Sequence, residues 1–178
     1  KWSIVLKAIE RPIKSKPLRD FIQGGQEILV IVNDATRPTP SGKIIGVLHE
    51  HLQGRNVKYL VATGMHRAPT PEEYRFIFGD IYENIKGNVY AHDAKNSPTV
   101  TLGTSKNGTV LKLNKMVDDA DRIIVISSVE PHYFAGYTGG RKSFLPGVSA
   151  YETIEQNHKL ALSIDAQALR MEGNPVNE

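Results

Sequence analysis

Five consecutive branched apolar residues, at positions 28–32, restrict the folds open to this chain more than any other feature. A strand made of them has apolar side chains on both faces, so both faces must be covered, as in a parallel sheet flanked by helices. The run is the longest apolar stretch in the sequence, whereas a membrane-spanning helix needs about 20 such residues. The sequence therefore predicts a buried strand at residues 27–32 and no membrane partner.

Strand and helix patterns alternate along the chain. Short runs rich in apolar residues predict further strands at residues 57–62, 88–92 and 123–127. Residues 40–53, between the first two strands, carry apolar side chains at helical spacing. This alternation is typical of a sheet whose strands run parallel.

Three short patterns mark helix starts and a turn. Thr70-Pro71-Glu72-Glu73 and Ser149-Ala150-Tyr151-Glu152 have the form of a capping box, so a helix is expected to start at each, the second reaching about residue 162. Asn107-Gly108 predicts a hairpin within residues 100–113. The whole pattern predicts an α/β fold: a mainly parallel, Rossmann-like sheet with flanking helices and a small β-hairpin.

Composition narrows the function classes. The chain contains no cysteine, which excludes disulfides, thiolate metal sites and a cysteine nucleophile, and fits a reducing, cytoplasmic compartment. The net charge is +3, from 22 Lys and Arg against 19 Asp and Glu, and the basic residues are spread along the chain. No nucleic-acid partner is expected, whereas a weak positive field suits a small anionic ligand.

Chemically active side chains follow the first two predicted strands directly. Asp34, Thr36 and Arg37 come after the first strand, and His66 comes after the second. Ligands of parallel sheets bind beyond the carboxyl ends of the strands, so these groups are candidates for ligand contact. Arg37 is suited to a carboxylate or a phosphate. Both groups also have a structural interpretation. The residues after the first strand can be a polar loop that caps the next helix, and His66 can be a solvated loop histidine.

The strand at residues 123–127 is followed by the densest group of functional residue types. Residues 130–142 hold a histidine, three glycines, three aromatic residues, an arginine and a lysine. The spacing fits neither the Walker A pattern nor G-x-G-x-x-G. The segment is either a glycine-rich surface loop or, as the aromatic residues favour, a packed loop that covers a flat ligand.

The remaining histidines have structural interpretations when taken singly. His158 lies in the last predicted helix, and His49, His51 and His92 are read in the same way. No H-x-x-x-H or H-E-x-x-H pattern occurs, so the sequence predicts no metal site built from protein side chains alone.

Five motifs occur in chain order at residues 33–38 (NDATRP), 62–67 (ATGMHR), 130–136 (EPHYFAG), 139–143 (GGRKS) and 156–158 (QNH). In order and spacing they resemble the N-terminal domain of the nickel-pincer-nucleotide lactate racemase family, over about residues 27–176. The resemblance is specific for the family and much less so for the substrate.

The resemblance implies a cofactor, the nickel-pincer nucleotide (pyridinium-3-thioamide-5-thiocarboxylic acid mononucleotide) with Ni(II). It implies covalent attachment of this nucleotide at Lys142 and a nickel–imidazole bond to His158. One protein ligand suffices when the cofactor supplies the others, and a carbon–sulfur–sulfur–nitrogen set favours planar Ni(II). Gly139, Gly140 and Arg141 are the candidates for binding the nucleotide phosphate, because glycine amides and a guanidinium both suit an anion.

The implied reaction is racemisation or epimerisation of a 2-hydroxy acid, lactate or a related one, by hydride transfer to and from the cofactor. Two enantiomers require two acid/base groups, so His66 and His132 are expected to share this role, each with a pKa near the working pH. Arg37 matches the residue that binds the substrate carboxylate, and Asp34 is assigned to the same substrate site.

The domain expectation also comes from the resemblance. Residues 1–178 are expected to form a single α/β domain, an incomplete N-terminal domain of a two-domain enzyme. The partners are then a small 2-hydroxy acid and the missing C-terminal domain, and the resemblance leaves open whether the fragment alone is active and holds the cofactor. Two alternatives stay open: another hydride-transfer reaction on the same cofactor, and a non-catalytic anion- or nucleotide-binding domain.

Overall fold

A computed structural model describes residues 2–178 of the chain. Its centre is a parallel sheet of four strands in the order β3-β2-β1-β6. The strands are β1 (Glu27–Asn33), β2 (Asn56–Ala62), β3 (Val89–Ala91) and β6 (Arg122–Ile126). These are the strands that the apolar runs predicted, and the expected α/β fold with a mainly parallel sheet is confirmed.

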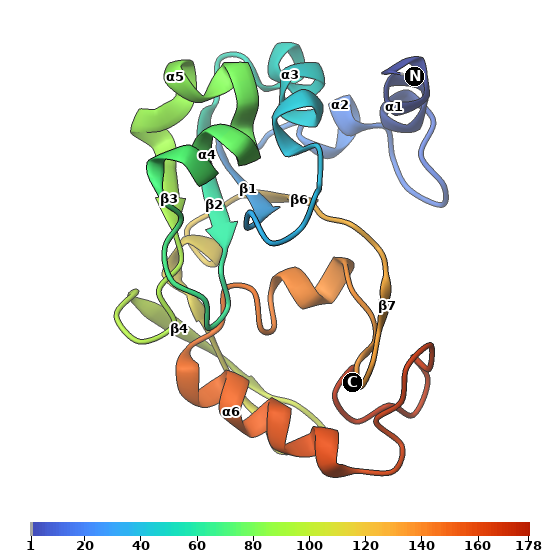
Figure 1. The fold of residues 1–178 in the computed structure, drawn as a ribbon. Helices are drawn as coiled ribbons and strands as arrows, with labels where there is room; N and C mark the ends of the chain where they lie inside the picture. Colours follow the sequence, from blue (N-terminus) through green and yellow to red (C-terminus); the bar gives the residue numbers. More distant parts are fainter. Residues whose placement is uncertain (1) are drawn as a thin grey trace.

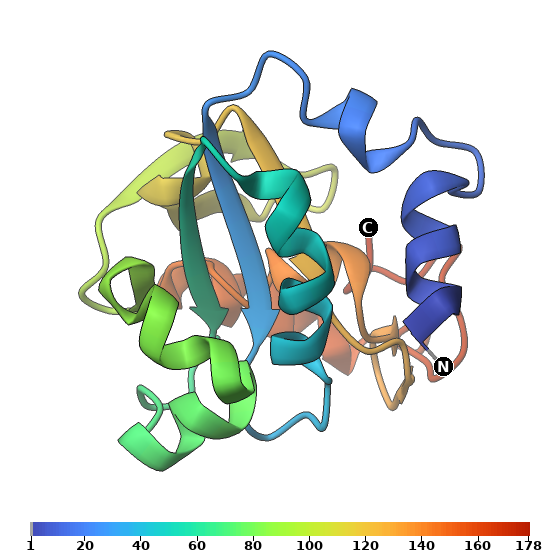
Figure 2. The same ribbon diagram turned by 90° about the horizontal axis from the view of Figure 1, so that it is seen from above.

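Both faces of the sheet are covered, which explains the unbroken apolar run. Every second residue of β1, from Ile28 to Val32, packs with α3 (Ser41–Leu52) and α4 (Pro71–Phe78). The residues between them pack with Val148 on the other face. Figures 1 and 2 show α3 and α4 on one side of β1 and β2, and the segment around residues 140–148 on the other. A polar residue anywhere in this run would be buried without water.

The remaining elements connect and flank this sheet (Figure 1). In chain order they are α1 (Trp2–Glu10), α2 (Leu18–Phe21), η1 (Gly79–Ile81), α5 (Tyr82–Ile85), η2 (Lys86–Asn88), β4 (Thr99–Thr104), β5 (Val110–Asn114), η3 (Lys115–Val117), β7 (Pro131–His132), β8 (Gly136–Tyr137), η4 (Gly140–Ser143), α6 (Tyr151–Lys159) and η5 (Leu160–Leu162), where η denotes a 3₁₀ helix. No helix among residues 2–178 is long and apolar enough to cross a membrane.

The two local patterns upstream of residue 110 are confirmed. The Thr70 side chain accepts a hydrogen bond from the Glu73 amide, and the Glu73 carboxylate accepts one from the Thr70 amide, so a capping box opens α4. Strands β4 and β5 form the expected antiparallel hairpin, and Gly108 in its turn has a φ of +80°. A residue with a side chain is disfavoured in that conformation.

The capping box predicted at Ser149 is wrong. Helix α6 has Ala150 at its N-cap and no side-chain cap bond. Ser149 instead pairs with Leu113 of β5 in an isolated bridge, and its hydroxyl donates to the Phe144 carbonyl at 2.7 Å. The Ser149 hydroxyl is thus turned to a carbonyl of the preceding segment, and the Glu152 carboxylate accepts from Lys112 at 2.8 Å. The α-helix ends at Lys159, where the chain continues as η5 to Leu162, so His158 lies in the last turn of α6.

The C-terminal residues 174–178 are fastened to the body of the molecule by buried amides. The side-chain amide of Asn174 donates to the carbonyls of Phe134 at 2.9 Å and of Gln167 and Arg170 at 3.1 Å each. Asn157 of α6 donates to the Val176 carbonyl at 3.0 Å. Asn174 is fully buried, so these bonds are shielded from competing water.

Candidate active site

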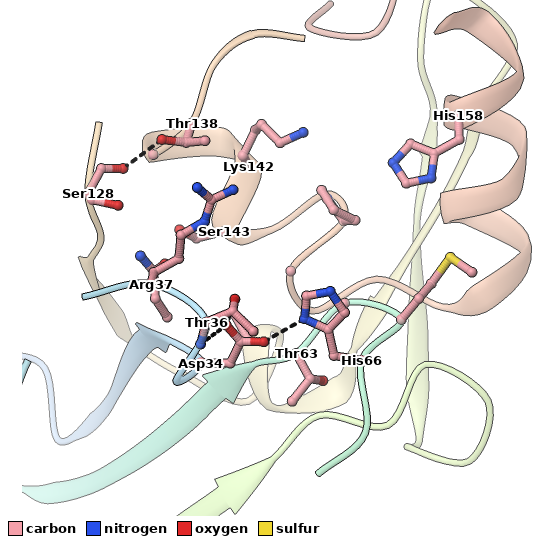
Figure 3. A pocket seen from close by; sticks show the side chains of 17 residues that line it. Asp34, Thr36, Arg37, Thr63, His66, Ser128, Thr138, Lys142, Ser143 and His158 are labelled. Carbon is pink, nitrogen blue, oxygen red and sulfur yellow. Dashed lines mark hydrogen bonds and ion pairs between the residues drawn. The ribbon is translucent and has the colours of Figure 1, made fainter. Parts of the chain in front are cut away.

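The sheet order places a crevice between β1 and β6. The chain runs from β1 to β2 and β3 on one side, and β6 then returns to the opposite side of β1. Ligands bind at such switch points, outside the carboxyl ends of the strands. A pocket of about 220 Å³ lies there, lined from the ends of β1, β2 and β6, from η4 and from α6. Figure 1 shows α6 beyond the ends of β1 and β2, and Figure 3 shows the side chains of the pocket.

Most of the predicted site residues line this pocket. They are Asp34, Arg37, His66, Gly139, Lys142 and His158. His132 is not among the lining residues. Its Nε2 atom lies 3.5 Å from the Nζ atom of Lys142, and Lys142 does line the pocket. Segments more than a hundred residues apart in sequence thus meet at one place.

Two of the predicted phosphate-binding residues do not line the pocket. Neither Gly140 nor Arg141 is among its lining residues, and an Arg141 Nη atom donates to the Asn177 carbonyl at 2.8 Å. Gly139 does line it; a Cβ atom there would lie 3.0 Å from the Ser128 carbonyl oxygen, and its φ is +80°. In the structure, Gly139 therefore packs against the backbone at Ser128, and Arg141 binds the backbone at Asn177. Phosphate binding by Gly139, Gly140 and Arg141 stays a prediction.

Asp34 and His66 form a hydrogen-bonded pair. The His66 Nδ1 atom lies 2.6 Å from one Asp34 carboxylate oxygen (Figure 3). The other oxygen accepts from the Thr36 hydroxyl at 2.5 Å and from the Thr36 amide at 3.2 Å. The Asp34 side chain is only 11% exposed, against 61% for His66. A carboxylate fixed in this way orients the imidazole and keeps the proton on Nδ1, which leaves Nε2 to exchange protons.

This arrangement specifies what Asp34 does in the pocket. Both of its carboxylate oxygens already have partners within the protein. The substrate contact predicted for Asp34 stays a prediction, and the contacts of Asp34 are those of a group that orients His66.

Arg37 points one edge of its guanidinium at Glu130. An Nη atom donates to a Glu130 carboxylate oxygen at 2.8 Å, and both side chains are about two-fifths exposed, at 41% and 40%. Glu130 lies at the start of the loop that carries His132. Its backbone amide donates a hydrogen bond to the Thr138 hydroxyl at 2.8 Å, which fixes the main chain there. The ion pair therefore joins the loop after β1 to the loop after β6.

The surroundings of Lys142 and His132 lower the pKa values of both side chains and so favour their neutral forms. Burial, and then the positive charge of Arg37, lowers the pKa of Lys142 to about 8. Burial, followed by the charges of Lys142, Arg37 and His158, lowers the pKa of His132 to about 4. The expectation that His132 has a pKa near neutrality is therefore wrong for the protein with a free, charged Lys142. Removing the Lys142 charge removes one of these causes and raises the pKa of His132.

His158 has the properties of a neutral imidazole ligand. Burial, and then the charge of Lys142, lowers its pKa, so the ring is deprotonated at neutral pH. The Phe134 ring lies between it and the other groups. Its centroid is 5.6 Å from that of His158, 4.5 Å from that of His132, and 5.5 Å from the Lys142 Nζ atom. One aromatic side chain is thus in contact with three predicted functional groups.

The side chains of the pocket differ from those of a metal site built from protein ligands alone. No group of three or more His, Cys, Asp or Glu side chains that could hold a metal ion occurs within residues 2–178. A metal held mainly by protein is therefore not built into the described part of the chain. The pocket does combine a partly deprotonated lysine amine with one neutral imidazole. These residues fit a cofactor that is attached through the amine and brings the other metal ligands itself.

Three further residues of this region were missed by the sequence reasoning. Thr138 brackets the loop, since its hydroxyl donates to the Ser128 carbonyl at 3.0 Å and its amide donates to the Glu130 carbonyl at 2.8 Å. The Ser128 hydroxyl lines the pocket and is buried without a hydrogen-bond partner within the described residues. Glu130 was only part of a motif. Ser128 and Thr138 belong to no sequence pattern by which they could have been found. Glu130 could have been found, because it is a carboxylate shortly after a predicted buried strand.

Comparison with known proteins gives a consistent result. Residues 1–170 match the family model described as the lactate racemase N-terminal domain. A lactate racemase from Thermoanaerobacterium thermosaccharolyticum is 38% identical over 98% of this chain and 42% of its own length. A lactate racemase from Lactiplantibacillus plantarum is 37% identical over 86% of this chain and 37% of its own length.

Solved structures show the same likeness. The lactate racemase apoprotein from T. thermosaccharolyticum superposes with a TM-score of 0.90 and 36% identity, over 98% of this chain and 43% of that one. A Thermotoga maritima protein superposes with a TM-score of 0.72 and 25% identity, over 90% of this chain and 43% of that one. The chain thus spans about two-fifths of the length of the proteins that it matches.

Proposed function

Because this chain belongs to the lactate racemase N-terminal domain family, we propose that it carries the acid–base and cofactor-holding residues of a 2-hydroxy acid racemase or epimerase. The substrate is lactate or a related 2-hydroxy acid. The relatives are more than twice as long as this chain, and the proposal includes a C-terminal domain that completes the substrate site.

One observation carries this proposal. Two histidines that differ in environment, His66 held by Asp34 and His132 beside Lys142, approach one pocket at the switch point of the sheet. A reaction that interconverts two enantiomers needs a proton acceptor and a proton donor on opposite sides of the reacting carbon, and groups fixed in this way contribute about 10²–10⁴-fold each.

The protein's own residues perform the proton transfer and the binding. When bound, the nickel-pincer nucleotide supplies a hydride acceptor and donor. The Nε2 atom of His66 or His132 takes the proton from the substrate hydroxyl, and either returns it. The free edge of the Arg37 guanidinium binds the substrate carboxylate, because the other edge is held by Glu130. Asp34 keeps His66 in the tautomer that can accept a proton at Nε2.

Lys142 and His158 would hold the cofactor. The lowered pKa of Lys142 gives it a larger fraction of neutral amine at physiological pH than an ordinary lysine has, as a covalent attachment requires. Neutral His158 is the nitrogen ligand for nickel.

The function is tested on the full-length protein produced in cells that make the cofactor. We expect interconversion of D- and L-lactate or of another 2-hydroxy acid, one equivalent of nickel, and a mass adduct on Lys142. Lys142→Ala and Lys142→Arg should both lose the adduct, because an arginine cannot supply the amine. Lys159→Ala, at an exposed lysine on α6, should retain it. An adduct that survives in Lys142→Ala would refute the attachment site.

A further inference from the structure

The ion pair between Arg37 and Glu130 places a fixed negative charge beside the pocket. The main chain of Glu130 is fixed, because its amide donates to the Thr138 hydroxyl and its carbonyl accepts from the Thr138 amide. Thr138 is in turn bound to the Ser128 carbonyl. From this fixed main chain the Glu130 carboxylate reaches Arg37, which lines the pocket, and accepts a hydrogen bond from it at 2.8 Å.

This contact leaves Arg37 with the capacity for one more carboxylate. A guanidinium has five N–H donors arranged so that each of two edges can hold one carboxylate. Glu130 already occupies a donor on one Nη atom. A ligand carboxylate bound at the other edge shares the guanidinium with Glu130 and experiences its charge at close range.

The charges around the pocket do not favour a second ligand carboxylate. Asp34 adds another buried negative charge, and it is committed to His66. Lys142 is the remaining lysine of the pocket, and a covalent attachment at its amine removes its positive charge. Arg37 is then paired with Glu130, and Asp34 lines the same pocket, so a dianionic ligand is repelled more strongly than a monoanionic one.

We propose that Glu130 is a specificity-determining residue that restricts the substrate to 2-hydroxy monocarboxylates, by holding Arg37 and repelling a second carboxylate on the ligand. This inference rests on the proposed function and names the substrate class of the same site. Glu130 acts through Arg37 and through its own field, and it takes no part in the proton transfer.

The test compares ligands that differ by one carboxylate, using calorimetric titration of the full-length, cofactor-loaded enzyme. Racemic lactate is the monocarboxylate, and racemic malate is lactate with a second carboxylate on its methyl carbon. Racemic 2-hydroxypentanoate controls for size. In Glu130→Gln the amide oxygen still accepts from Arg37 but the charge is gone. We expect the affinity for malate relative to lactate to rise roughly three- to tenfold, with the ratio of 2-hydroxypentanoate to lactate unchanged.

Two further variants separate charge from structure. Glu130→Asp retains the charge and should retain the preference for lactate over malate. Glu83→Gln removes a carboxylate from an exposed ion pair with Lys86, away from the pocket, and should leave every ratio unchanged. A merely structural role for Glu130 would weaken all three ligands together, and that result, or an unchanged malate-to-lactate ratio in Glu130→Gln, would overturn the proposal.

The same titration distinguishes this inference from the function on which it rests. If the wild-type enzyme binds lactate and the ratios do not move, only the role of Glu130 is wrong. If the loaded wild-type enzyme binds neither lactate nor 2-hydroxypentanoate, the proposed function is wrong, and the substrate class falls with it.

Discussion

Asp34 shows how a single carboxylate can decide the chemistry of its neighbour. It binds His66 through one oxygen and Thr36 through the other, so the imidazole is held in one orientation. We predict that Asp34→Asn in the full-length enzyme lowers the rate of racemisation about 10²–10⁴-fold, because an amide can stabilise the wrong tautomer. The measurement is the racemisation rate in both directions, with circular dichroism to confirm folding. A loss of less than tenfold would mean that His66 does not need this partner.

The two histidines are expected to act on opposite enantiomers. At equilibrium a catalyst cannot favour one direction, so His66→Ala and His132→Ala should each slow racemisation in both directions together. A single turnover should separate them. With His66→Ala one lactate enantiomer should still yield the 2-keto acid while the other stalls, and with His132→Ala the preference should invert.

Rapid chemical quench of the loaded enzyme, mixed separately with each enantiomer, measures the 2-keto acid formed. The wild type is the control, and it should oxidise both enantiomers. If both variants lose the same enantiomer, the two histidines do not act as opposed bases.

The pKa of Lys142 can be measured by its chemistry. With a pKa of about 8, about half of the amine is neutral at that pH, whereas an ordinary lysine near 10.5 has under about 1% neutral amine there. Limited acetylation of the protein without cofactor should label Lys142 with a midpoint near pH 8, before the exposed Lys159. Peptide mass mapping across pH reads this out. Arg37→Gln should move the midpoint upward, because Arg37 is the second cause of the shift.

The residues of the site could be found from the sequence better than their contacts could. Strand ends are visible as the points where apolar runs stop, and this located Asp34, Arg37 and His66 at one edge of the sheet. Which of them touch depends on loop geometry, so the pairing of Arg37 with Glu130, 93 residues away, was not predicted. The low pKa of His132 was not predicted either, since it depends on burial and on charges that only the fold brings together.

At the scale of the element, α3 carries two glycines with opposite expected effects. A Cβ atom at Gly42 would lie 2.0 Å from the Phe78 carbonyl oxygen, whereas nothing lies within 4 Å of one at Gly46. Gly46→Ala should therefore stabilise the protein by about 0.5–1 kcal/mol through helix propensity. Gly42→Ala should destabilise it, because α3 must move away from the end of α4. Urea unfolding of the two variants beside the wild type measures both; a stabilising Gly42→Ala would contradict the close approach.

Elements were predictable where their cause is local. The Thr70 box needs only residues three apart, and it was found. Ser149 has the same local pattern, but it pairs with Leu113, 36 residues earlier, and such a distant partner cannot be read from a sequence window. The short β7–β8 pair was likewise hidden in a glycine-rich segment, since two-residue strands leave no periodicity to detect.

At the scale of the whole molecule, histidines couple stability to pH. The pKa values of His92, His132 and His158 are lowered in the folded protein, mainly by burial, so the unfolded chain binds more protons than the folded one below about pH 6.5. Stability is therefore fully present above this pH and falls as the pH decreases toward the folded pKa values. Thermal unfolding between about pH 7.5 and pH 5 should show a falling midpoint, and His132→Gln should make the fall smaller.

The hydrogen bond from the Asn174 side chain to the Phe134 carbonyl links the position of residues 174–178 to that of the pocket. The amide also holds the carbonyls of Gln167 and Arg170, and Phe134 itself stands between His132, His158 and Lys142. The buried Asn174 side chain bonds the Phe134 carbonyl directly. A displacement of residues 174–178 is therefore expected to move Phe134, whose ring contacts the residues of the pocket. A force applied at residues 174–178 would therefore reach Phe134, forty residues earlier in sequence, and through its ring the neighbouring imidazoles of His132 and His158.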